Sequence, residues 1–335
     1  MKTQSHNKRI IPFLVLSVLI LFVPLQTTYA EFTKDIDNEN HHTEKSVNEN
    51  DPYESHFFRI RGIPTIHVKS INGNIDVISN PNIDGIQVDL YVERSFTLWS
   101  GPRSLDDFRI IIRQQGDRII ASVEERRAGS TRRRGDIRFH FVIQTPGNAN
   151  TQIRTGNGDI TLSNHEGEHF LQNQFGNIEV GNVSGMLQVS TITGGIYLDH
   201  INGTTFASSV NGDVEIVECT GEMRLKSVAG NISAFSSTGT LVAATTSGNI
   251  TSDFRNISVG VYLESVSGNI DLILPDETSY RIEGSAMQFD FSGLKQDLIT
   301  SMTRRNRDAS LITGDGDIPV QLSTFAGRIK VSHSE

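Results

Sequence analysis

A Gly-x-[Ile/Val] step that recurs at a fixed interval constrains the fold of this 335-residue chain more than any other feature. Six copies follow one another at intervals of 18 residues, and a seventh comes after 20. They begin at Gly158, Gly176, Gly194, Gly212, Gly230, Gly248 and Gly268. A second glycine lies 9 residues after each of the first five, at Gly167, Gly185, Gly203, Gly221 and Gly239. A register kept over so many copies is typical of stacked, nearly identical structural units.

Apolar residues alternate with polar ones inside each repeat. Position +2 after the first glycine is Ile or Val in every copy, and position +4 is apolar in most of them. Alternation with period 2 indicates strands, so each repeat predicts two short strands, one in each nine-residue half. Strands joined by turns this short cannot reverse into hairpins and keep one repeated sequence. We therefore expect them to coil, with successive copies stacked ~4.8 Å apart as a parallel β-solenoid.

Small polar residues continue the inward column at position +6 of the second half, and position +8 follows it with residues such as Phe175. Stacked hydroxyls and amides can hydrogen-bond to one another along the axis, as in cross-β ladders. Each half has nine residues, an odd number, so strict alternation would turn the next apolar residue to the wrong face. Each Gly-Asn or Gly-Asp step therefore has to accommodate one extra residue that restores the alternation. Gly tolerates positive φ, and Asn and Asp tolerate it better than most residues, which we take as the reason for the step.

With these motifs the sequence resembles the putative-adhesin family of bacterial envelope proteins. The resemblance runs from about Phe57 to Ser332 and includes an opening Ser-Ile-Asn-Gly-Asn-Ile at 70–75 and a closing Gly-Asp-Gly-Asp-Ile at 314–318. It implies an all-β, single-stranded, right-handed parallel β-solenoid and a role at the bacterial envelope. Neither a ligand nor a catalytic residue follows from it.

The start of the chain is typical of a secretory signal. Residues 1–30 combine a basic beginning, a 14-residue apolar core from Ile10 to Val23, and small residues before a cleavage site after Ala30. The core is short for a membrane span, so we expect no transmembrane span in the mature chain, an uncleaved anchor being the alternative. Residues 31–56 are polar and acidic and predict a disordered tether.

The remaining chain divides into three parts. Residues 57–150 are β-rich but irregular, and we expect an antiparallel N-terminal cap that includes a first rung. Residues 151–275 form the regular solenoid, and 276–335 supply C-terminal rungs and a second cap. Caps are expected because the terminal rung of a solenoid exposes unpaired strand edges.

The charge balance limits the partners. Removing the signal leaves 27 basic residues (30 − 3) against 39 acidic ones, a net charge of −12, which argues against nucleic-acid binding. The only cysteine, Cys219, lies in the repeats, which excludes an internal disulfide and a lipid-attachment cysteine after the signal.

Two strings match enzyme motifs without their context. His165-Glu-Gly-Glu-His169 fits HExxH, but zinc binding by that motif needs a helix, and here Gly167 opens a strand. Arg328-Ile329-Lys330 occurs in pectin-cleaving β-helix enzymes, yet the acidic cluster that such chemistry needs is missing nearby. We expect no enzyme activity, no metal and no cofactor.

Two kinds of residue are candidates for ligand binding. Arginine clusters suited to an anionic glycan or phosphate comprise Arg126, Arg127, Arg132, Arg133, Arg134, Arg304, Arg305 and Arg307. Solvated hairpin tips are the alternative explanation. Aromatic residues suited to sugar rings or a partner protein occupy outward position +3 of the second half, at Phe170, Phe206 and Tyr262. Cover by the tether or a terminal segment is the alternative.

The sequence therefore predicts an exported, non-enzymatic β-solenoid that presents a rigid binding surface in the periplasm, on the cell surface or outside the cell. The expected partner is an anionic glycan or an envelope protein. A structural or signalling accessory of the envelope stress response is the alternative, and a polysaccharide-active enzyme is a weaker one.

Overall fold

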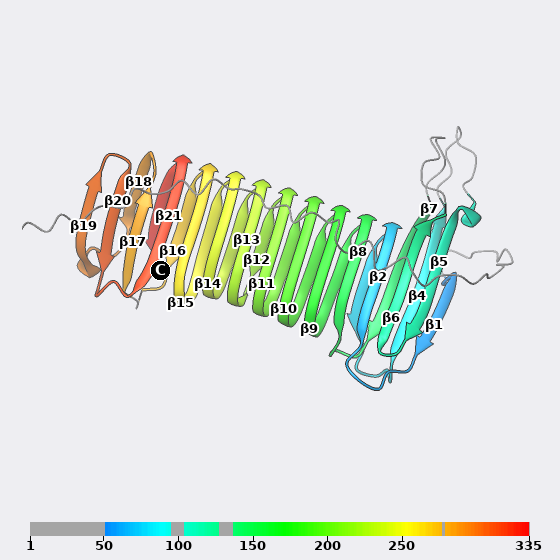
Figure 1. The fold of residues 1–335 in the computed structure, drawn as a ribbon. Helices are drawn as coiled ribbons and strands as arrows, with labels where there is room; N and C mark the ends of the chain where they lie inside the picture. The colour runs from blue at the N-terminus through cyan, green and yellow to red at the C-terminus, as the bar shows by residue number, and fades with distance from the viewer. Residues whose placement is uncertain (1–50, 95–103, 127–136, 277–278, 335) are drawn as a thin grey trace, which may run out of the picture. The chain divides into compact units, whose positions relative to one another are not determined.

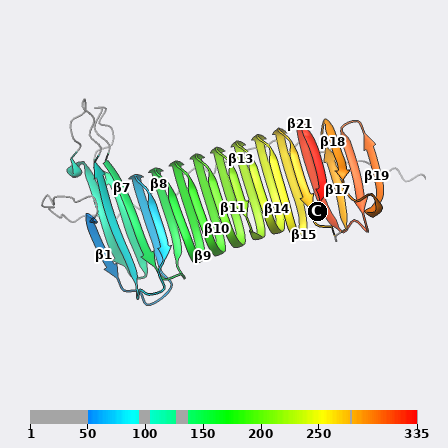
Figure 2. The same cartoon turned by 180° about the vertical axis from the view of Figure 1, so that it is seen from behind.

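The computed structural model describes residues 51–94, 104–126, 137–276 and 279–334. The chain divides into two compact units, 1–46 and 47–335, and every described residue belongs to the second. Its strands lie side by side in one continuous series (Figures 1 and 2). Two short 3-10 turns accompany them, η1 (Leu105–Asp107) and η2 (Gln296–Leu298). No helix among the described residues is long and apolar enough to cross a membrane.

The regular part is a parallel β-solenoid, as the repeat predicts. Ile178 pairs with Ile160 on one side and Ile196 on the other, and the 18-residue register continues along the stack. Its strands are β8 (Asn150–Asn157), β9 (Ile160–Phe175), β10 (Ile178–Thr193), β11 (Ile196–Asn211), β12 (Val214–Val217), β13 (Thr220–Ala229), β14 (Ile232–Ser247), β15 (Ile250–Ser267) and β16 (Ile270–Leu274). The two extra residues of the last interval are absorbed by register shifts between β14 and β15.

Most rungs differ from the prediction in being one continuous 16-residue strand rather than two short ones. The chain bends between the two halves without losing its pairing to the neighbouring rungs. A residue in the left-handed region makes each bend, and the series is Asn164, Asn182, His200, Glu218 and Ser236, with φ between 51° and 60°. Sequence analysis does not find this series because only its first two members have a side chain that favours the conformation.

Glycines stack directly on glycines. A Cβ added at any glycine of the Gly176–Gly268 series would lie 1.9 to 2.3 Å from the carbonyl oxygen of the glycine one rung earlier. Real Cβ atoms do not approach an oxygen so closely, so this column excludes every other residue. The second series, from Gly185 to Gly239, shows the same contact.

The inward hydroxyls do not bond to one another, contrary to the expectation for position +6. Each donates instead to the carbonyl of the stacked glycine one rung earlier, as Ser209 does to Gly194 at 3.1 Å and Ser227 to Gly212 at 3.0 Å. Position +8 faces outward, and the Phe175 side chain is 51% exposed. The inward column therefore ends at +6.

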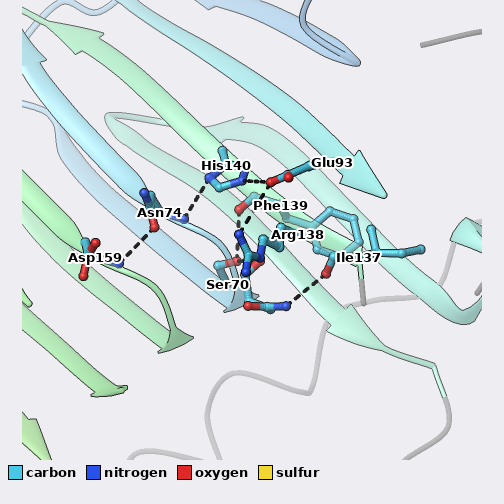
Figure 3. A network of polar contacts seen from close by, with 9 residues as sticks. Ser70, Asn74, Glu93, Ile137, Arg138, Phe139, His140 and Asp159 are labelled. Atoms are coloured by element: carbon cyan, nitrogen blue, oxygen red, sulfur yellow. Dashed lines mark hydrogen bonds and ion pairs between the residues drawn. The ribbon is translucent and has the colours of Figure 1, made fainter. Parts of the chain in front are cut away.

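The Asn or Asp of each step also has a different role from the one predicted. No Asn or Asp of the step takes positive φ, and among its glycines those from Gly158 to Gly212 do. The side-chain oxygen of the next residue accepts the backbone N–H of its counterpart one rung later, as Asp159 does from Asn177 at 2.7 Å. The ladder is already present at Asn74, which accepts from Asp159 and whose own N–H donates to His140 Nδ1 at 3.1 Å (Figure 3).

The N-terminal end is an antiparallel cap around a first rung. β2 (Thr65–Asn72) and β3 (Ile75–Ser79) form that rung and pair in parallel with β8 and β9. On their other side lie the remaining strands, β1 (Glu54–Phe58), β4 (Ile86–Arg94), β5 (Phe108–Gln115), β6 (Arg118–Glu125) and β7 (Ile137–Thr145). β1 pairs antiparallel with β4 and begins at Glu54, so the chain is ordered before residue 57, where the tether was expected to end.

The C-terminal end is built in an unexpected order. The last strands of the chain, β21 (Ile318–Ala326) and β22 (Arg328–His333), pair in parallel with β15 and β16, as a rung should. They are not the outermost rung, because earlier strands pair with their other edge (Figure 1). The outer strands are β17 (Tyr280–Ser285), β18 (Gln288–Gly293), β19 (Ile299–Arg305) and β20 (Asp308–Thr313).

We expect Gly230→Ala to lower the free energy of unfolding by at least about 2 kcal/mol, because the new methyl group would meet the Gly212 carbonyl oxygen at 2.1 Å. The φ of Gly230 is not in the left-handed region, so this variant tests the close contact alone. Gly181→Ala is the control, since a Cβ there meets no atom within 4 Å. Equal urea midpoints for the two variants would contradict the stacking role.

Candidate binding surface

Two outer faces run along the solenoid, one for each half of the rungs. We call the face formed by positions +3, +5 and +7 after the second glycine the second-half face, and its counterpart after the first glycine the first-half face. On the second-half face the predicted +3 column is one ladder in register. Its members from β9 to β15 are Phe170, Gln188, Phe206, Arg224, Val242 and Tyr262.

The aromatic members of this ladder are half-buried rather than fully exposed. The Arg224 guanidinium lies 5.5 Å from the centre of the Phe206 ring and forms an ion pair with Glu222 at 2.5 Å. This packing holds Phe206 against the sheet and turns the positive charge toward a carboxylate. The ladder is therefore a largely neutral ridge whose four apolar members are interrupted by Gln188 and Arg224.

A second apolar ladder, at position +7, escaped the sequence analysis. It contains Ile192, Val210, Val228, Val266 and Phe325, interrupted by Thr246. Ile192 is 43% exposed and Phe325 69% exposed. The alternating pattern alone marks +7 as an outward position, so its apolar residues were predictable from the sequence. Small or polar side chains at +5, such as Ser190, Ser208 and Ala244, separate the two ridges.

The first-half face has a different character. Glu179 and Glu215 lie in register on either side of Tyr197. Burial first, and then the charges of Asp199, Glu215 and Glu179, raise the pKa of the Tyr197 hydroxyl. At the adjoining bend His200 forms ion pairs with Asp199 and Glu218. Several carboxylates thus gather on this side of the stack, away from the apolar ladders.

The candidate arginines that the structure describes do not gather in one site. Arg127, Arg132, Arg133 and Arg134 lie outside the described residues. Arg126 follows β6, and its Nε donates to the Phe108 carbonyl at 3.1 Å. It belongs to the N-terminal cap, so it lies at the opposite end of the stack from the other cluster.

The C-terminal cluster makes contacts within the cap. The Arg304 guanidinium lies 5.4 Å from the Phe289 ring centre, and that of Arg307 lies 4.9 Å from the Phe325 ring centre. Arg307 also donates to the Phe325 and Thr324 carbonyls. Arg305 is exposed in β19. Two of these three guanidinium groups thus hold the cap together, which leaves less of the cluster for a ligand.

The HExxH string lies in β9, and both imidazoles point into the core. His165 Nδ1 donates to the Ser163 carbonyl at 2.6 Å, and His169 Nδ1 is 3.0 Å from the Thr151 hydroxyl. The two rings meet edge to face with centroids 5.9 Å apart. Burial lowers the pKa of His165, and burial together with the charge of His165 lowers the pKa of His169 to about 4.

The chain matches one known protein family. The family model described as Toastrack DUF4097 matches residues 46–332. The chain belongs to this family. The family match agrees with the resemblance drawn from the glycine repeat and with the all-β fold. No curated protein matches the chain.

Two solved structures are similar to this Toastrack chain. One, of a putative cell adhesion protein from Clostridium sporogenes, shares 11% identity with a TM-score of 0.22 and covers 84% of this chain and 98% of its own. The other, of a putative adhesin from Bacteroides fragilis, shares 14% identity with a TM-score of 0.39 and covers 83% and 96%. At these scores neither superposition transfers a site to this chain.

We expect acid to destabilise the solenoid between pH 6.5 and about 4. Both histidines have a lowered pKa in the fold, so the unfolded chain binds more protons in this window and stability falls as the pH drops. For His169 the full loss is on the order of 3 kcal/mol. The free energy of unfolding of His169→Leu, measured with urea, should depend less on pH than that of the native protein.

His200→Gln is the control for this prediction. His200 is exposed, and its hydrogen bond to Asp199 raises the pKa of its imidazole, so its contribution has the opposite sign. The core assignment is wrong if His169→Leu keeps the full acid sensitivity.

Proposed function

We propose that this Toastrack protein is an exported, non-enzymatic binding module of the bacterial envelope, which uses the second-half face as its contact surface. The observation that carries the proposal is the pair of apolar ladders at +3 and +7. Exposed apolar ridges of this length are unusual on a solvated sheet and are typical of interaction surfaces. The adhesin descriptions of the two similar structures agree with such a role.

The construction of the stack supports the same role. From β9 to β15 the residues of the ladders are fixed by pairing to rungs on both sides, so the surface loses little conformational freedom on binding. In the regular part the chain has short bends instead of the long loops that usually wall a catalytic pocket. Among the described residues, no group of three or more His, Cys, Asp or Glu side chains has the arrangement of a metal site.

The expected export follows from the signal-like residues 1–30. The charges of the acidic first-half face would keep the protein in solution while the neutral second-half face makes contact. An anionic partner is better served by the neutral second-half face than by the first-half face. Envelope glycan and envelope protein are both compatible with this face, and a glycan array distinguishes them.

We expect Phe206→Ser combined with Tyr262→Ser to weaken binding to isolated bacterial envelopes about tenfold or more. The loss should persist at 1 M salt, because apolar contacts are not screened whereas arginine contacts are. Binding is measured by co-sedimentation, and thermal melting confirms that the variant is folded.

Tyr197→Ser is the matched control, since Tyr197 is an exposed aromatic residue on the first-half face. Binding that disappears in high salt and on Arg304→Ser with Arg305→Ser, while ignoring the aromatic changes, would assign the contact to the arginines instead.

A further inference from the structure

The five central rungs of the second-half face repeat the pattern of their +3 and +7 ladders when the rung order is reversed, whereas the next pair of rungs, with Gln152 opposite Tyr262, does not. The centre of this palindrome is the segment Phe206–Val210 of β11. In the +3 ladder, Gln188 and Arg224 lie one rung either side of Phe206, and Phe170 and Val242 lie two rungs away. Polar residues thus occupy matching places, and so do apolar ones.

The +7 ladder has the same symmetry about Val210. Ile192 and Val228 lie one rung either side of it, and Gln174 and Thr246 lie two rungs away. Apolar again matches apolar and polar matches polar. Two independent ladders therefore share one centre.

The +5 column between them adds charge complementarity. Arg154 lies three rungs before Ser208, and Glu264 lies three rungs after it. Neither side chain has an ion-pair partner within the part of the chain that the structure describes. Reversal of the rung order would place these two opposite charges face to face, once at each end of the pattern.

A two-fold axis in the plane of the face produces this reversal if it runs along the central strand. Two copies then meet face to face with their stacks antiparallel, and every residue meets its counterpart across the centre. An axis along the stack would instead bring each +5 residue opposite itself. Arg154, Lys226 and Glu264 would each face a like charge, which costs affinity. The charges therefore select the antiparallel arrangement.

The size of the face is sufficient for a stable contact. Seven rungs at ~4.8 Å and the five residues from +3 to +7 at ~3.3 Å give roughly 34 Å by 17 Å, or roughly 570 Å² on each copy. The two copies together would bury roughly 1,100 Å², just above the ~1,000 Å² that a specific interface needs. Sheets packed face to face in this aligned manner are common within proteins.

We propose that the partner of the second-half face is a second copy of this chain, bound as an antiparallel two-fold pair centred on Phe206, Ser208 and Val210. This inference rests on the proposed function and names its partner. Adhesion by this protein is then homophilic, because the protein on one surface binds the same protein on another surface.

Single cysteines in the +5 column test the geometry. Ser208 lies at the centre, so Ser208→Cys should form a disulfide-linked dimer by itself under mild oxidation. Ser190 lies opposite Lys226, so Ser190→Cys should cross-link only when mixed with Lys226→Cys. The native Cys219 is 1% exposed, so it should not form an intermolecular disulfide. Cross-linking of Ser190→Cys with itself, or absence of the mixed product, would overturn the arrangement.

A charge exchange tests the contact at its ends. Sedimentation equilibrium of the native protein should give a dimer, and Arg154→Glu or Glu264→Arg alone should raise its dissociation constant about tenfold or more. The double variant should restore the native value, because it exchanges the two charges and keeps their attraction. Failure of the double variant to recover would overturn the pairing of these residues.

The two proposals fail differently. The protein could stay monomeric at millimolar concentration and yet bind envelopes from cells that lack it. This outcome would support the proposed function and overturn the homophilic partner. A protein that is monomeric and binds no envelope loses both. Phe206→Asp should abolish the dimer without changing the melting temperature by more than a few degrees, which separates a surface effect from unfolding.

Discussion

The fold depends on one close contact between successive rungs, in which the carbonyl oxygen of a glycine approaches the Cα of the next glycine. That carbonyl oxygen occupies the space that a Cβ would need, and a hydroxyl group beside the later glycine donates to it, as Ser209 does beside Gly212. Glycine and an inward hydroxyl are thus two parts of one interaction. Substitution of either part would leave a buried carbonyl without a donor or without room.

This contact also explains why the surface forms ladders. Because the glycines fix the register, residues 18 positions apart are held in line on both faces, and a preference for one residue type becomes a continuous stripe. The inner columns are nearly uniform because they fill one core. The outer columns are free to differ, which allows an acidic face and an apolar face to occur on the same backbone.

Sequence reasoning predicted the features that follow from the repeat itself. The rung length, the inward positions +2 and +4 and the outward position of Phe170, Phe206 and Tyr262 all follow from period and alternation. The Asn/Asp ladder, the partner of the inward hydroxyls and the left-handed bend were missed, since each depends on contacts between rungs rather than within one. The +7 ladder could have been found from the alternation, whereas the dispersal of the arginines over both ends could not.

The position of β21 and β22 has a consequence for how the molecule is completed. These strands follow β17 and β18 in the sequence, yet they fill a rung between β15–β16 and the earlier β17–β18. The stack therefore cannot grow simply from one end to the other as the chain emerges. Until β22 pairs with it, β16 keeps an open edge of the kind that recruits foreign strands. A chain interrupted before residue 318 would therefore present this edge to other chains instead of covering it.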